Sequence, residues 1–161
     1  ARLAVARVCR TFSRRAEARQ ALEQAARIVR ESRLVALRAE VAHLTALLEE
    51  EDGRRPAAER AYRRALIELR ARPAPHLRWR LLRDLGAFLA DAPASRRPGR
   101  RLLVQARRAL GQIEQRIVDP VLLHSFRTLP EHAALLATPE RDVSNLPTLD
   151  EDGSDSPTPA S

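Results

Sequence analysis

The chain contains no lysine: all 29 of its basic residues are arginine, against 21 acidic residues. Without lysine, this segment cannot hold the phosphate-binding loop of P-loop nucleotide-binding proteins or the phosphate-contacting lysine of protein kinases. Heavy use of Ala, Arg and Leu without Lys is also typical of coding in a GC-rich genome. We therefore interpret the net charge of +8 first as a property of the surface and only then as a sign of nucleic-acid binding.

Cysteine is nearly absent as well. The single thiol, Cys9, excludes an internal disulfide and a cysteine-based metal cluster. The histidines lack the i, i+4 spacing of a metal-binding helix; they are His43, His76, His124 and His132. We therefore expect no catalytic residue, no metal and no cofactor, so no enzymatic activity in this segment.

Long apolar runs, glycines and aromatic residues are scarce too. No apolar run approaches the roughly 18 residues that span a bilayer, and no leader pattern opens the chain, so we expect a cytoplasmic protein without a membrane partner. Only five of the 161 residues are glycine and only five are aromatic, and no alternation of polar and apolar residues is sustained, which argues against strands. The absence of methionine, together with a helical pattern that already includes Ala1, leads us to expect a fragment of a longer polypeptide.

Apolar residues instead recur at helical spacing along most of the chain. Turn signals divide them into predicted helices over residues of about 5–12, 18–30, 32–51, 56–72, 77–90, 102–117, 120–127 and 130–137. From Thr138 onward the chain is rich in Pro, Ser, Thr and Asp, so we expect a disordered acidic tail over 138–161. The predicted organisation is one helical domain over 1–137 followed by this tail.

Three segments share one pattern of small and large apolar residues, and they are 18–26, 58–66 and 102–110. In AAERAYRRAL (57–66), Ala58 is followed by Tyr62 four residues later and by Ala65 three residues after that. The same frame occurs 40 residues earlier and 44 residues later, each time after a Leu-rich helix. Because one helix pair cannot bury its own apolar face, this recurrence predicts an all-α fold: an α-solenoid of about three helix pairs with a C-terminal capping helix pair.

The pattern resembles the tetratricopeptide repeat (TPR), whose second helix has Ala, an aromatic and Ala at these spacings. Leu82, Leu85-Gly86 and Leu89 resemble its first helix, although the repeat here exceeds the family's length of about 34 residues. The stretch IVDPVLLHSFRTLPEHAALLA (117–137) resembles the C-terminal end of large bacterial signalling proteins, in which a Ser/Thr kinase or a signalling ATPase precedes a TPR array. This resemblance implies a regulatory segment of a bacterial protein, with any catalytic domain elsewhere in a longer parent chain.

The resemblance also implies a protein–protein interaction scaffold, whose partner is another protein or a neighbouring domain of its parent. We consider four candidate partner-binding residues, since aromatic and arginine side chains dominate interface energies: Tyr62, Arg78, Trp79 and Arg83. For the two aromatics, core filling is the alternative. The alternative function is that of a basic helical nucleic-acid-binding domain, based on arginine clusters such as that at 96–101. A further hypothesis is that the acidic tail folds back onto these arginines and screens their charge.

Overall fold

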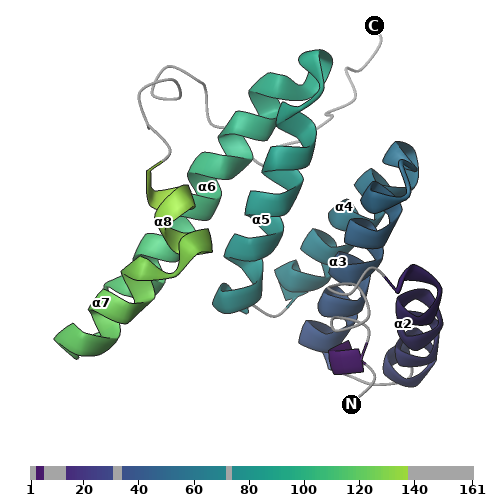
Figure 1. The fold of residues 1–161 in the computed structure, drawn as a ribbon, viewed down its shortest axis with the longest axis horizontal. Coiled ribbons are helices and arrows are strands. Elements are labelled where there is room, and N and C mark those ends of the chain that lie inside the picture. Colours follow the sequence, from purple (N-terminus) through teal and green to yellow (C-terminus); the bar gives the residue numbers. More distant parts are fainter. Residues whose placement is uncertain (1–2, 6–13, 31–33, 72–73, 138–161) are drawn as a thin grey trace, which may run out of the picture.

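The computed structural model describes residues 3–5, 14–30, 34–71 and 74–137, so Cys9, most of the helix predicted at 5–12 and the predicted tail lie outside the described residues. All regular secondary structure within these ranges is helical, which confirms the all-α prediction (Figure 1). None of the described helices is long and apolar enough to cross a membrane. The elements are α2 (Arg15–Arg30), α3 (Val35–Glu51), α4 (Arg55–Ala71), α5 (Pro75–Ala90), the 3-10 helix η1 (Pro93–Ser95), α6 (Arg96–Glu114), α7 (Pro120–Thr128) and α8 (Pro130–Leu136).

Prolines mark where several helices begin. Pro120 opens α7, and the Asp119 carboxylate accepts hydrogen bonds from the backbone N–H groups of Val121 and Leu122, at 2.7 and 3.0 Å. This confirms the predicted N-cap, because a helix N-terminus has backbone donors without helical partners. The predicted start of the sixth helix near residue 102 was wrong. Helix α6 begins at residue 96, since Pro98 lies in its first turn, where no backbone N–H is needed.

The helices lie side by side largely in chain order. Helices α3 and α4 form one hairpin and α5 and α6 a second, while α2 packs on α3 and α8 on α6 (Figure 1). The turn between α3 and α4 includes Gly53 with φ of 71°, a left-handed conformation that favours glycine. The two hairpins contact each other through α5, which packs against α4 and α3.

Each junction between neighbouring helices has its own apolar core. The largest joins α3, α4 and α5 around Tyr62, whose side chain is fully buried. Smaller cores lie between α2 and α3 and among α5, α6 and α8. The first three positions of the sequence pattern are buried in its first two copies, with Ala18 and Ala58 at 0% exposure. In the third copy Ala106 is buried, whereas Leu102 and Ala109 are only partly buried. The pattern therefore marks the helix faces that pack against neighbours.

The two C-terminal helices contribute unequally to the apolar packing. Helix α8 places Leu135 in the core that it shares with α5 and α6, and Phe126 and Leu136 pack against its edge. Helix α7, by contrast, has no buried residue. Of the capping helix pair predicted from the sequence, α8 therefore covers the open face of the second hairpin, and α7 adds mainly Phe126.

Two glycines permit a close approach of α5 and α6. A Cβ placed on Gly99 of α6 would lie 2.5 Å from the backbone nitrogen of Ala90 and 2.7 Å from the carbonyl oxygen of Gly86. A Cβ on Gly86 of α5 would lie 2.9 Å from the Leu103 side chain. Only residues without a side chain allow the two backbones to approach this closely.

A line of polar contacts connects α3, α5 and α8 across the array. His43 Nε2 of α3 lies 2.7 Å from an Asp84 carboxylate oxygen of α5, and Arg83 donates to the other oxygen, also at 2.7 Å. Arg83 further donates to Glu131 of α8 at 3.0 Å. Burial opposes ionisation of Asp84, but its hydrogen bonds with His43 and Arg83 outweigh burial and hold the pKa of the carboxyl below its ordinary value.

We expect the Asp84→Asn variant to be less stable at neutral pH and to lose less stability on acidification. The folded-state pKa of Asp84 is lowered, so its ionised form contributes stability above the unfolded pKa of about 4, and this contribution is lost as the pH falls through the folded value. Urea unfolding at pH 7, 4 and 3, followed by far-UV circular dichroism, measures the slope of the free energy of unfolding against pH. Asp91→Asn, an exposed site, is the control. Equal slopes in wild type and Asp84→Asn below pH 4 would contradict the assignment.

Candidate functional site

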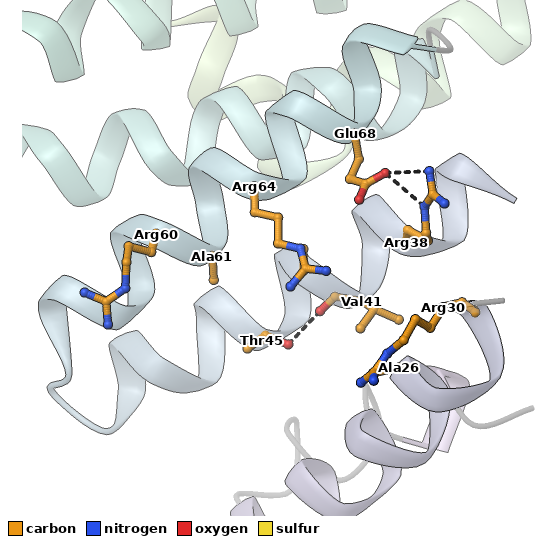
Figure 2. Close-up of a pocket in the computed structure, with 11 residues that line it drawn as sticks. Ala26, Arg30, Arg38, Val41, Thr45, Arg60, Ala61, Arg64 and Glu68 are labelled. Atoms are coloured by element: carbon orange, nitrogen blue, oxygen red, sulfur yellow. Dashed lines mark hydrogen bonds and ion pairs between the residues drawn. The ribbon is translucent and has the colours of Figure 1, made fainter. Parts of the chain in front are cut away.

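A groove of about 490 Å³ lies between α2, α3 and α4 (Figure 2). Eleven residues line it, and they divide into a small apolar floor and a polar rim. Helix α2 contributes Ala26, Val29 and Arg30, α3 contributes Arg38, Val41, Ala42 and Thr45, and α4 contributes Arg60, Ala61, Arg64 and Glu68.

The floor of the groove is apolar and closely packed. Val29 and Val41 are buried in the packing between α2 and α3, and Ala42 is buried in the core of α3, α4 and α5. The one hydroxyl in the groove is turned inward: Thr45 Oγ1 donates to the carbonyl oxygen of Val41 at 2.8 Å. The floor can therefore cover apolar side chains of a ligand without leaving a polar group of its own unpaired.

The rim carries four arginines and one glutamate. Arg38 and Glu68 neutralise each other, since two guanidinium nitrogens lie 2.9 Å from one Glu68 oxygen. The other three arginines, Arg30, Arg60 and Arg64, are exposed and make no ion pair with any part of the chain that the structure describes. In Figure 2, Arg64 extends from α4 and Arg30 from α2 toward the space between these helices.

The positions of these arginines along their helices explain how they reach one surface. Arg60 and Arg64 are one turn apart on α4, on the side away from the buried positions of Ala58 and Ala65. Arg30 lies in the last turn of α2, where a positive charge is also favoured by the helix dipole. The groove therefore presents three unpaired positive charges over an apolar floor.

Such a surface can bind carboxylates or phosphates. Guanidinium groups donate paired hydrogen bonds to both kinds of anion. The hydroxyl and the carboxylate of the groove are both engaged, Thr45 with the carbonyl oxygen of Val41 and Glu68 with Arg38. Within residues 3–5, 14–30, 34–71 and 74–137, no three His, Cys, Asp or Glu side chains are grouped to hold a metal ion. The arrangement is suited to recognition of an anionic ligand.

The residues predicted from the sequence to bind a partner do not form one surface. Tyr62 is 0% exposed in the core of α3, α4 and α5, where its hydroxyl donates to Glu50 at 2.7 Å. Trp79 is 3% exposed in a different core, edge-on to His132. The chain has few other large side chains that could fill its cores, so both rings are buried there. Neither ring is available to a partner.

The two predicted arginines have separate surroundings. Arg83 lies 5.2 Å from the centroid of the Trp79 ring and pairs with Asp84 and Glu131, so it joins α5 to α8. Arg78 is exposed on α5, outside the groove. The signal for the groove was present in the sequence, in the i, i+4 spacing of Arg60 and Arg64. That spacing alone could not show which helices lie opposite these two arginines.

A second exposed surface is apolar. It consists of Val118, Val121, Leu122 and Leu129, which are 95%, 72%, 62% and 45% exposed, on α7 and the turns beside it. This patch has no set of converging charges to select a ligand, in contrast to the groove. The groove is therefore the candidate site.

Comparison with protein-family models, curated proteins and solved structures found no match to this chain, so the assignment of a function depends on the groove itself.

Proposed function

We propose that this chain is a non-catalytic interaction scaffold that binds an acidic segment of a partner protein, or of a neighbouring domain, in the groove between α2, α3 and α4. The helices would act as a TPR-like solenoid, a rigid support that holds arginines from separate helices at fixed positions. The resemblance of residues 117–137 to bacterial signalling proteins supports a role for this scaffold in the regulatory part of a kinase- or ATPase-linked protein. The proposed ligand combines carboxylates with one or two apolar side chains.

The observation that carries the proposal is the combination of an apolar floor with three arginines that have no acidic partner among the described residues. Most other arginines near the cores are engaged: Arg83 with Asp84 and Glu131, and Arg55 with the Phe88 ring and carbonyl. An arginine held close to apolar surface without a carboxylate retains its donors for a ligand.

Protein is favoured over nucleic acid by the position of the aromatic rings. Single-stranded nucleic acid is bound by stacking bases on exposed aromatic side chains along a basic groove. The groove has no aromatic residue, and Tyr62 and Trp79 are buried elsewhere. Nucleic-acid binding remains the alternative outcome of the experiment below.

We expect the Arg60→Gln/Arg64→Gln variant to bind a fluorescent peptide of several Asp, Glu and Leu residues about tenfold or more weakly than the wild type. Both side chains are exposed, so the substitution removes charge with little effect on folding. The control, Arg78→Gln/Arg108→Gln, removes two exposed arginines outside the groove and should retain affinity. Fluorescence anisotropy at about 50 and 200 mM salt measures both.

Two results would contradict the proposal. Equal loss of affinity in the groove variant and the control would show that the peptide responds only to net charge. Binding of a DNA duplex or single strand at low salt with higher affinity than the peptide, falling steeply as salt rises, would support the nucleic-acid alternative instead.

A further inference from the structure

The chain itself contains a segment with the chemistry that the groove accepts. Residues 138–161 include six acidic residues and one arginine. Leu149 comes directly before the acidic run Asp150-Glu151-Asp152, and Leu146 lies three residues before Leu149. This order, apolar residues followed by several carboxylates, matches an apolar floor bordered by unpaired arginines.

The segment is long enough to reach the groove. Leu149 lies 12 residues beyond Ala137, the last residue that the structure describes, and an extended chain of that length spans up to about 40 Å. From α8 the path to the groove passes α6, α5 and α4 (Figure 1). Neighbouring helix axes are about 8–10 Å apart, so these three steps total roughly 30 Å. The acidic run can therefore lie over the groove of its own chain.

The groove is a better site for this segment than the arginines closest to α8. Arg80 and Arg83 already bind Glu131 of α8, at 3.2 and 3.0 Å. Arg127 is engaged by Glu114. The N-terminal turn of α6 is basic, with Arg96 and Arg97 exposed, but neither residue lines the groove. The groove, in contrast, combines arginines that have no acidic partner among the described residues with an apolar floor for leucine side chains.

We propose that residues 146–155 occupy the groove when no partner is bound and must leave it before a partner binds. This inference depends on the proposed function, because it assigns an internal competitor to the same site. A ligand that needs an open site has its apparent affinity reduced by the fraction of molecules in which the site is open. The acidic segment thereby lowers the apparent affinity of the groove for a partner.

Deletion of residues 138–161 should raise the affinity for the acidic peptide about five- to tenfold, as expected if the segment occupies the groove 80–90% of the time by rough estimate. The gain should disappear when Arg60→Gln/Arg64→Gln is combined with the deletion. Leu146→Ser/Leu149→Ser keeps every charge and should still raise the affinity, because it removes the apolar contacts of the segment with the floor. Anisotropy titrations of these variants measure all three effects.

The outcomes separate this inference from the proposed function. If deletion leaves the affinity unchanged while the groove arginines still matter, the inference is overturned and the proposed function stands. If the shortened chain binds no peptide, both are wrong. If deletion raises the affinity but Leu146→Ser/Leu149→Ser does not, the segment acts by charge alone. If Arg96→Gln/Arg97→Gln reproduces the gain, the segment lies on α6. Either result overturns the inference.

Discussion

Replacement of Tyr62 by alanine is expected to lower the free energy of unfolding by about 3–5 kcal/mol, the range for large aromatic residues removed from a core. Tyr62 is 0% exposed, and its ring packs 5.6 Å from the centroid of Phe88 and 6.0 Å from that of His43. It therefore holds α3, α4 and α5 together at the junction of the two hairpins. Urea unfolding followed by far-UV circular dichroism measures the loss.

Two companion variants identify the cause. Tyr62→Phe removes the hydroxyl that donates to Glu50, keeps the ring, and should cost about 0.5–1.5 kcal/mol. Ile67→Ala truncates a side chain of the same helix that is 62% exposed and should cost less than about 1 kcal/mol. A Tyr62→Ala effect no larger than that of Ile67→Ala would show that the junction is not packed as described.

The second large effect is expected at the close approach of α5 and α6. Gly99→Ala should destabilise the chain by about 3 kcal/mol, because its Cβ would overlap the backbone of α5 at Ala90 and Gly86, which cannot move aside as a flexible side chain could. Thermal and urea unfolding measure the change.

Gly111→Ala is the matched control on the same helix. A Cβ at Gly111 meets no atom within 4 Å, so alanine should stabilise the helix by about 0.5–1 kcal/mol through its higher helix propensity. Opposite signs for the two substitutions are the expected result. If Gly99→Ala were as favourable as Gly111→Ala, the two helices would have to lie farther apart than the structure places them.

Several features of the fold could be predicted from local pattern. The all-α class followed from apolar residues at helical spacing, and the start of α7 followed from Asp119-Pro120, because caps and proline act over a few residues of chain. The burial of Ala58, Tyr62 and Ala65 agreed with the recurring frame. The start of α6 was missed because residues 96–101 are mostly arginine, so the apolar stripe begins later than the helix.

The candidate site could not be predicted in the same way. Tyr62 and Trp79 were considered as partner contacts because aromatic rings favour interfaces, but the same size and apolarity favour cores, and sequence does not distinguish the two. Arg78 and Arg83 have the same residue type five positions apart, yet one is exposed and the other is paired with Asp84 and Glu131.

The sequence by itself determined that this protein is helical, where most of its helices begin and end, and which face of most helices is buried, because these properties depend on residues within a few turns of one another. Only the tertiary structure decided which arginines remain without acidic partners. Arg30 belongs to α2 and Arg64 to α4, and α3 lies between these two helices in the chain. The two arginines share a groove only because α2 and α4 both pack against α3. Charge pairing and pocket shape depend on the distance between helices, which no local spacing specifies.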